Sequence, residues 1–467
     1  MLHVALAFVS SCSPVQESEL PPPNIVIVLV DDLGWGDLGA DLPGIGGRSD
    51  HRTPHLTGFA KESLVMTNGY SAAPNCAPSR ASLQTGRYTP RHGILTVGTS
   101  ARGRAKNRAL VPVPNETVLP DGEITLAERL APAGYSSVHL GKWHLGEDPR
   151  TQGYDVNIGG NQRGHPKSYF SPYKNPALKD GPKGEYLTER LTNEAIAQLD
   201  ELKPPFLMHL AYYTVHTPLQ APKERIEERR GAGAKSPKYA AMVEAMDAEF
   251  GRLLGALEAK GLAGNTVVLF TSDNGGHGPV TNLGPLRGYK GTLDEGGIRV
   301  PWIVRWPGRI APGVSDSPVH HVDVAPTLES LAKVEPAVAR EGAAPPPELD
   351  GVDLTGLWFR GEAPAPRPLL WHFPVYLEGK SDRFPQWRTT PGCAIQVGSL
   401  KLIEFFGAGP LGPRRELFDL SLDPKETTDA SADRGPEIEA IRALRDRMLR
   451  EMGARFPTFE DPPASDG

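Results

Sequence analysis

The clearest pattern in this chain is a series of short apolar runs, each followed at once by polar residues. The first, residues 24–30 (NIVIVLV), has no polar residue after Asn24. A strand that is buried on both faces of a parallel sheet loses the alternation of apolar and polar positions and shows a continuous run of this kind. The same reasoning predicts further strands at residues 135–140, 205–213, 265–270 and 298–306.

Segments with helical spacing of apolar residues separate these runs. Leu56, Phe59, Ala60 and Leu64 recur at helical spacing after Thr53-Pro54, a start signal for a helix. Comparable patterns predict helices at residues 123–133, 187–199, 239–257 and 324–332. Alternating strands and helices indicate the α/β class. We therefore expect a large, mostly parallel (mixed) sheet flanked by helices.

The last quarter of the chain has a different pattern. A Pro/Ala-rich stretch at residues 335–350 is followed by short strands that pair through a two-residue turn at Gly398-Ser399, and a helix is predicted near the end, over residues 436–452. This pattern predicts a smaller α+β domain with antiparallel strands. The expected domains are a leader and tether (1–23), a catalytic α/β domain (24–345) and a C-terminal domain (346–467).

Composition and charge restrict the possible partners. The 467 residues carry a net charge of −6, which provides no overall attraction for nucleic acid, so no nucleic-acid partner is expected. An anionic substrate would need a locally basic pocket. The abundance of Gly (51) and Pro (47) indicates many ordered loops, and three cysteines form no disulfide framework.

The first eleven residues are apolar but too few to span a bilayer, and they are typical of an export signal. Val9-Ser10-Ser11-Cys12 is compatible with a lipoprotein cleavage box, which would leave Cys12 lipidated and the protein attached to a membrane. The alternatives are a soluble export signal and a misassigned start codon. We expect an exported protein, periplasmic or at the cell surface.

Pairs of oxygen donors follow two of the predicted strands. Asp31-Asp32 comes directly after residues 24–30, and Asp273-Asn274 follows residues 265–270. Ligands of open α/β sheets collect at the carboxyl ends of strands, and adjacent carboxylates repel each other unless a cation lies between them. Oxygen ligands favour Ca²⁺ or Mg²⁺, whereas Zn²⁺ usually keeps His or Cys ligands.

Cys76 lies in the stretch N-C-A-P-S-R-A-S-L-Q-T-G-R, residues 75–87. Pro78 is compatible with the first turn of a helix, and Thr85-Gly86 supplies a stop signal. Cys76 is therefore predicted at a helix N-terminus, where amides and the helix dipole favour an anion or a reactive group. Arg80 is predicted one turn further on. The alternative for a lone cysteine is a small buried apolar residue.

Four segments together resemble the sulfatase family, a branch of the alkaline-phosphatase-like superfamily. They are C-A-P-S-R with L-Q-T-G-R (76–87), G-K-W-H-L-G (141–146), G-Y-K-G-T with E-G-G-I-R-V-P (288–301), and L-F-D-L with D-P-K-E (417–426). The resemblance implies that a formylglycine-generating enzyme oxidises Cys76 to formylglycine. It also implies one Ca²⁺ per site, held by residue 76 with Asp31, Asp32, Asp273 and Asn274.

The resemblance also implies roles in hydrolysis of a sulfate ester to an alcohol and sulfate. The expected sulfate-binding residues are Arg80, Lys142, His144 and Lys290. Asp273 is expected to help deprotonate the attacking hydroxyl. His216, just past the predicted strand 205–213, is our choice for the general acid that protonates the departing alcohol, with Lys290 as the competitor for that role.

Substrate-binding residues are harder to predict. The long loop 153–182 is rich in Gly, Pro, Tyr and Lys, and His165, Lys167 and Tyr169 are the candidates on it, with His277 after the Asp273-Asn274 pair. An exported sulfatase with such a loop suggests a sulfated sugar or polysaccharide, with galactose or N-acetylgalactosamine as examples.

Three alternatives remain open at this point. A phosphonate or phosphodiester hydrolase of the same superfamily shares the formylglycine motif. A surface lipoprotein could bind sulfated glycan without turnover. An enzyme with an unmodified cysteine nucleophile is the third, although it would have no need of the acidic strand ends.

Overall fold

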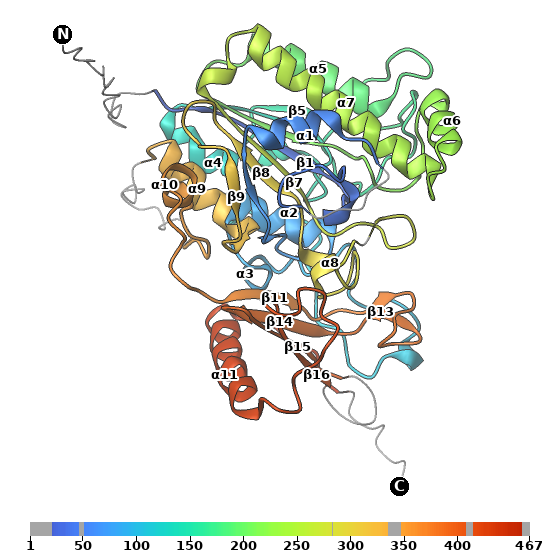
Figure 1. Ribbon diagram of the computed structural model, residues 1–467, viewed down its shortest axis with the longest axis vertical. Helices are drawn as coiled ribbons and strands as arrows, with labels where there is room; N and C mark the ends of the chain where they lie inside the picture. Colours follow the sequence, from blue (N-terminus) through green and yellow to red (C-terminus); the bar gives the residue numbers. More distant parts are fainter. Residues whose placement is uncertain (1–20, 46–50, 283, 335–346, 408–413, 460–467) are drawn as a thin grey trace, which may run out of the picture.

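The computed structural model describes residues 21–45, 51–282, 284–334, 347–407 and 414–459. In these residues a large helix-flanked sheet lies above a smaller sheet with one long helix beside it (Figure 1). Cys12 and the rest of the predicted export signal lie outside the described residues, as does most of the predicted linker. No described helix has the length and apolar character needed to cross a membrane.

The larger sheet is mixed and mostly parallel, as predicted. Its strands run parallel from β5 to β7, and β8 runs against both of its neighbours. The spatial order is β5 (Val156–Ile158), β4 (Ser136–Gly141), β6 (Phe206–Ala211), β1 (Asn24–Val30), β7 (Thr266–Ser272), β8 (Trp302–Arg305), β2 (Leu64–Met66) and β9 (Gly313–Ser315).

Strand β1 lies at the centre of two hydrophobic layers, which explains its continuous apolar sequence. Val26, Val28 and Val30 pack on one face, and the isoleucines and leucine between them pack on the other, all fully buried. The first face is covered by α1 (Pro54–Lys61), α5 (Leu187–Glu201) and α7 (Pro237–Ala259), with α6 (Lys223–Gly231) against α7. The second is covered by α2 (Cys76–Thr85), α4 (Leu126–Leu130), α9 (Val324–Leu331) and α10 (Thr355–Arg360).

The smaller sheet is antiparallel throughout. It is ordered β11 (Leu369–Phe373), β14 (Gly392–Val397), β15 (Leu400–Phe405) and β16 (Arg414–Asp419), and α11 (Gly435–Glu451) packs on one face. Gly398-Ser399 joins β14 to β15 as a tight turn. Its other face packs toward the short α3 (Thr89–His92) and α8 (Glu295–Ile298) regions, with two small ladders nearby, β3 (Gly69–Tyr70) with β10 (Val319–His320) and β12 (Leu377–Glu378) with β13 (Trp387–Thr389).

Two predicted boundaries were wrong. Leu64 was expected on the helix that begins at Thr53-Pro54, but α1 ends at Lys61 and Leu64 pairs with Val304 in β2. Ile298 was expected to begin a strand, but it ends α8, and the strand starts only at Trp302, after Pro301. In both places tertiary pairing, which local periodicity does not contain, decides where the element ends. The predicted domain limits at residues 345 and 346 stay a prediction.

Candidate active site

The carboxyl ends of four neighbouring parallel strands carry most of the predicted site. β1, β4, β6 and β7 lie side by side in the order β4-β6-β1-β7. The residues that follow them share one edge of the sheet, as expected for an open α/β fold. They are Asp31 and Asp32 after β1, Lys142 after β4, His216 after β6, and Asp273 and Asn274 after β7.

Cys76 begins α2, as the sequence predicts. Asn75 precedes it in an extended backbone conformation, and the Asn75 side-chain oxygen accepts a hydrogen bond from the Cys76 amide at 2.9 Å. Gly86, at φ +70°, ends the helix, where a residue with a Cβ would be strained. The Cys76 side chain is 2% exposed, and its sulfur lies 3.6 Å from Asp31 Oδ1. The helix start therefore aims residue 76 at the acidic end of β1.

Two buried cations pair with the carboxylates on one side of Cys76. Lys142 Nζ donates to both oxygens of Asp31, at 2.9 and 2.7 Å. Arg80, one turn into α2, donates from Nε to Asp273 Oδ2 at 2.9 Å and from another guanidinium nitrogen to the Lys142 carbonyl at 2.8 Å. Charge-assisted contacts of this kind hold the carboxylates in fixed positions.

Lys290 closes the other side of the site. Its ammonium lies 2.6 Å from Asp32 Oδ1 and 3.1 Å from the Cys76 sulfur. The backbone of its loop is fixed next to Cys76, because the Gly291 amide donates to the Pro74 carbonyl at 2.7 Å. Gly291 has φ +88°, a conformation that favours glycine. Residue 76 thus lies within contact of both a cation and the carboxylates.

The charges of the site are closely matched. Three buried carboxylates face three buried or nearly buried cations, which are Asp31, Asp32 and Asp273 against Arg80, Lys142 and Lys290. The side chains alone therefore carry no net charge when all six are ionised. A bound divalent cation would give this enclosed site a net positive charge, which is what an anionic substrate requires.

Burial and these neighbours shift the titration of the central groups. Burial raises the pKa of the Cys76 thiol to about 12, although Lys142 and Lys290 oppose the shift. Burial alone would also raise the pKa of Asp32, but Lys290, His216 and Lys142 outweigh it and hold that pKa well below its usual range. The Asp32 carboxylate and the Lys290 ammonium both stay charged, because Asp32 and the other acidic groups of the site raise the pKa of Lys290 above its ordinary value. An unmodified thiol here stays protonated at neutral pH.

The donor set fits a hard divalent cation. Asn274 Nδ2 donates to Asp32 Oδ1 at 2.8 Å, whereas its Oδ1 is buried with no hydrogen-bond partner among the described residues. Ligand atoms from Asp31, Asp32, Cys76 and His216 lie within 4.8 Å of one another. An orphaned amide oxygen beside clustered carboxylates is the chemistry expected at a Ca²⁺ or Mg²⁺ site.

Two histidines complete the predicted site. His216 Nδ1 lies 2.7 Å from the Thr217 carbonyl, so that Nδ1 carries the proton, and Nε2 lies 3.7 Å from Asp32 Oδ2. Burial lowers the pKa of His216 to about 3. His144 has φ +65°, its amide donates to the Asn161 carbonyl at 3.0 Å, and burial lowers its pKa well below the ordinary value. Both rings are neutral in this structure.

Comparisons with known proteins agree with this geometry. The family model for sulfatases matches residues 23–334. The chain belongs to the sulfatase family. It is 33% identical over 385 residues to N-acetylgalactosamine-6-sulfatase of Mus musculus, covering 75% of this chain and 69% of that relative. It is 32% identical to steryl-sulfatase of Mus musculus, covering 94% and 83%. The crystal structure of Ps i-CgsB in complex with k-i-k-neocarrahexaose superimposes with a TM-score of 0.71 at 28% identity, covering 92% of each chain.

The chain is accordingly a sulfatase enzyme, and hydrolysis of a sulfate ester is its class of reaction. The resemblance read from the four sequence segments is confirmed, and so is the α/β fold. Three of those segments supply Cys76, Arg80, Lys142, His144 and Lys290, and the structure brings all five together with the strand-end residues.

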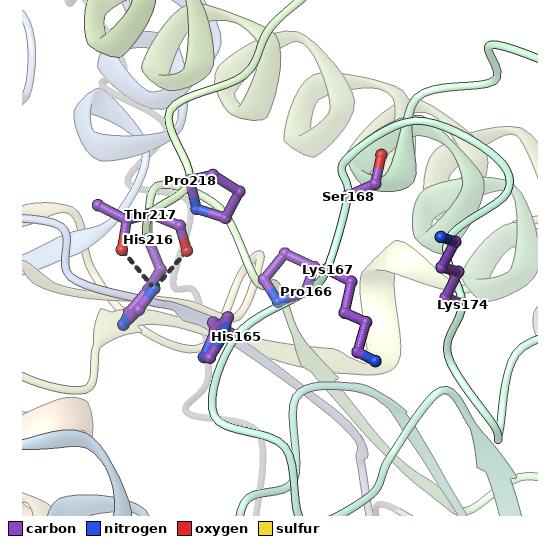
Figure 2. A pocket seen from close by; sticks show the side chains of 8 residues that line it. All are labelled: His165, Pro166, Lys167, Ser168, Lys174, His216, Thr217 and Pro218. Atoms are coloured by element: carbon purple, nitrogen blue, oxygen red, sulfur yellow. Dashed lines mark hydrogen bonds between the residues drawn. The ribbon is translucent and has the colours of Figure 1, made fainter.

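A pocket of about 670 Å³ opens beside His216 in this sulfatase (Figure 2). His165 and Lys167 line it, as expected for substrate-binding residues. Tyr169 does not, and this prediction is corrected. Its side chain is fully buried, and its hydroxyl donates toward the carbonyls of Tyr213 and His216, at 2.5 and 2.8 Å. These two hydrogen bonds hold Tyr169 behind the pocket, where it anchors the loop to the end of β6.

His277 follows β7, four positions after Asp273. It is partly buried, and burial lowers its pKa, with Asp32, Lys290 and Arg388 among the charges that act on it. Its carbonyl accepts hydrogen bonds from the amides of Val280 and Thr281, both at 3.0 Å. The ring is therefore near the reaction centre without lining the pocket in Figure 2.

The sequence did not reveal a set of residues that holds the Lys290 loop from the smaller sheet. Arg388 donates to the Lys290 carbonyl at 3.3 Å, and Arg383 pairs with both oxygens of Asp294, at 2.7 and 2.6 Å. Lys401 contacts Glu295 at 2.8 Å. Each pair joins residues about a hundred positions apart, so no local pattern signals it.

The late D-P-K-E segment belongs to the same network. Glu426 accepts a hydrogen bond from the Glu295 amide at 2.7 Å and pairs with Lys401 at 2.8 Å. All three side chains are fully buried. This fourth family segment therefore fixes α8, which follows the Lys290 loop, rather than contacting the reaction centre.

Proposed function

We propose that this sulfatase removes sulfate from a sulfated carbohydrate, using formylglycine at position 76 and one Ca²⁺. The observation that carries the proposal is the position of residue 76 at the start of α2, buried among carboxylates and 3.1 Å from the Lys290 ammonium. A thiol with a pKa of about 12 is a poor nucleophile at neutral pH, which disfavours an unmodified cysteine enzyme. Oxidation to an aldehyde, hydrated to a geminal diol, would supply one hydroxyl to attack sulfur and a second whose deprotonation releases sulfate.

The residues that would hold the metal are Asp31, Asp32, Asp273 and Asn274, with residue 76. When bound, Ca²⁺ would offset the carboxylate charge and polarise the oxygens of the sulfate. The unpartnered Oδ1 of Asn274 supports an oxygen ligand at this position. The three carboxylates suit metal binding because a neighbouring cation or amide already orients each of them.

Arg80, Lys142, His144 and Lys290 would bind the sulfate and stabilise the charge that develops as the S–O bond breaks. Their contacts to the carboxylates and to backbone carbonyls orient them before substrate binds, so little reorganisation is needed during the reaction. Asp273 Oδ1 accepts from the Asp32 amide at 3.1 Å, which orients it as the carboxylate that helps deprotonate the attacking hydroxyl.

His216 would donate the proton to the departing alcohol. It lines the pocket in which the sugar would lie, whereas Lys290 points at residue 76. The imidazole is neutral here, and its Nδ1–H donates to the Thr217 carbonyl. The negative charge of a bound sulfate ester would favour protonation of Nε2. Both reactive nitrogens lie near Asp32, but His216 lines the pocket and Lys290 does not, which favours His216 for this step.

A carbohydrate substrate is supported by a relative named as an N-acetylgalactosamine-6-sulfatase and by the His, Lys, Ser and Thr side chains that line the pocket beside His216. Steryl-sulfatase shows that the family also includes other substrates. We also propose export to the periplasm or cell surface, with maturation by a formylglycine-generating enzyme and with Cys12 lipidated. The support is the apolar start of the chain and the cysteine that follows it. Labelling with a radioactive fatty acid tests the anchor, and a Cys12→Ser variant that keeps the label contradicts it.

The test of the proposed function combines peptide mass and turnover. We expect the peptide that contains residue 76, from the native host, to be lighter by about 18 Da than its cysteine form, as oxidation to the aldehyde requires. The same protein should release 4-nitrophenol from 4-nitrophenyl sulfate, and Cys76→Ala should abolish that release. Active protein with an unmodified thiol, or faster hydrolysis of phenyl phosphonate esters than of sulfates, would overturn the proposal.

A further inference from the structure

The pocket beside His216 extends well past the reaction centre. Its volume of about 670 Å³ is in the middle of the range for ligand sites, roughly 300–1,000 Å³. His165 lies parallel to His216, with 6.1 Å between ring centroids, and Figure 2 shows Lys167 beyond His165. A sugar with its sulfate at residue 76 would therefore reach this pocket with its neighbouring unit.

The charge of the far part of the pocket is entirely positive. Lys167 and Lys174 line it, and none of the residues that line it is an Asp or Glu. Most cations elsewhere in this site are paired with a carboxylate, but within the described residues neither of these ammonium groups has a salt bridge or hydrogen bond. Both side chains are exposed to solvent and free to meet a ligand.

The backbone that carries the two lysines is anchored rather than loosely attached. Lys174 has φ +54°, and its carbonyl accepts a hydrogen bond from Arg163 at 2.5 Å. The next residue, Asn175, donates to the Gly159 carbonyl at 2.9 Å. Two residues after Lys167, Tyr169 fastens the loop to the carbonyl of His216 itself. The backbone at both lysines is therefore anchored close to the reaction centre.

We propose that Lys167 and Lys174 form a subsite for a second anionic group, on the sugar next to the one that loses its sulfate. The substrate class would then be an oligosaccharide or polysaccharide with a negative charge on the adjacent unit, either a sulfate or a carboxylate. This inference rests on the proposed function, because it takes residue 76 as the place of sulfate removal. Two solvent-exposed ion pairs are each modest in energy, so they tune selectivity rather than create it.

The test compares three disaccharides as inhibitors of 4-nitrophenyl sulfate turnover. They are κ-neocarrabiose with one sulfate, ι-neocarrabiose with two, and a hexuronyl–N-acetylgalactosamine 6-sulfate with a sulfate and a carboxylate. We expect the wild-type protein to bind the doubly charged sugars more tightly. The Lys167→Met/Lys174→Met double variant should reduce that preference about fivefold, as expected for two exposed pairs.

The matched control is Lys179→Met/Lys183→Met, which removes two exposed lysines of the same loop that do not line the pocket. Its preference should equal that of the wild type. If the Lys167→Met/Lys174→Met variant loses affinity for ι-neocarrabiose alone, the second group is a sulfate. If it loses affinity for the hexuronyl sugar alone, the second group is a carboxylate. An unchanged preference in the Lys167/Lys174 variant, or an equal change in the control, overturns the subsite.

The failure of the proposed function is distinguishable from the failure of the subsite. Turnover of 4-nitrophenyl sulfate by wild-type protein tests the reaction alone. Calorimetric binding of ι-neocarrabiose and κ-neocarrabiose to Cys76→Ala protein tests the subsite without turnover. Cys76→Ala protein should bind ι-neocarrabiose more tightly than κ-neocarrabiose, and adding the Lys167→Met/Lys174→Met substitutions should reduce this difference. Equal affinities of Cys76→Ala protein for the two sugars would contradict the subsite.

Discussion

Lys401 in β15 and Glu295 in α8 form a fully buried ion pair between the smaller sheet and the segment that follows Lys290, with 2.8 Å between Nζ and Oε1. Glu426 shares the same ammonium at 2.8 Å. Buried ion pairs are costly to break because the remaining charge stays desolvated. This ion pair therefore links the stability of the smaller sheet to that of the segment that follows Lys290.

We expect Lys401→Met to lower the free energy of unfolding by about 3–5 kcal/mol, because it removes the buried cation that Glu295 and Glu426 share. Urea denaturation followed by circular dichroism measures the change. Lys425→Met is the control, since Lys425 is exposed and adjacent to Glu426 in the same segment. A loss below about 1 kcal/mol in the Lys401 variant would show that the network contributes little.

We expect His216→Asn to slow hydrolysis of an alkyl or sugar sulfate by roughly 10²–10⁴, the usual range for loss of a general acid. Hydrolysis of 4-nitrophenyl sulfate should slow much less, because 4-nitrophenolate departs without a proton. The measurement is kcat/KM for both substrates in wild type and variant. Equal losses for the two leaving groups would remove His216 from this role, and a strong dependence on leaving group in Lys290→Met instead would transfer the role to Lys290.

We expect the purified protein to contain about one Ca²⁺ per chain and negligible Zn²⁺, because the predicted ligands are oxygen atoms. Elemental mass spectrometry measures the content. Exhaustive treatment with EGTA should abolish activity and lower the melting temperature, since the metal binds the folded state alone, and Ca²⁺ should restore both. Full activity in demonstrably metal-free protein, or recovery with Zn²⁺ in place of Ca²⁺, would contradict the oxygen-only site.

We expect a pH dependence of stability from His92, which is far from the metal ligands in sequence and fully buried. Burial lowers its pKa to about 3 from an ordinary value of 6.5. Between these values the unfolded chain binds a proton that the folded protein does not. The free energy of unfolding therefore falls as the pH drops below 6.5, by about 1.4 kcal/mol per pH unit for this one group.

Urea denaturation at several pH values between about 4.5 and about 7.5 measures this slope. His92→Asn keeps an acceptor for the Ile94 amide, which His92 Nδ1 now accepts at 3.2 Å, and it should flatten the slope by about one proton. His55→Asn, the same substitution at an exposed histidine, is the control. An unaltered slope in the His92 variant would show that His92 titrates alike in both states.

The sequence carries most of the fold and the core of the site for a simple reason. A strand that is buried on both faces must be apolar throughout, as residues 24–30 are, so its end is visible where Asp31 begins. Cys76 is similarly marked by the helix start around it. The opposite holds for Tyr169, because whether a loop side chain points into a pocket or away from it depends on tertiary contacts.

Long-range pairs explain what could not be predicted. Arg388 reaches the Lys290 carbonyl across 98 positions, and nothing near either residue indicates the contact. Lys174 gave no sequence signal either, since lysines are common on surface loops. Pairing between distant strands also decided that Leu64 belongs to β2.

The enclosure of Cys76 imposes an order of events on the newly made chain. The side chain is 2% exposed in the folded protein, so any enzyme that oxidises it must act before α2 packs. The residues that secure the Lys290 loop are synthesised much later, ending with Glu426. At about 5–20 residues per second, the roughly 350 residues between them take on the order of 20–70 s. If residue 76 is oxidised as proposed, the late synthesis of the smaller sheet leaves this interval for the modification.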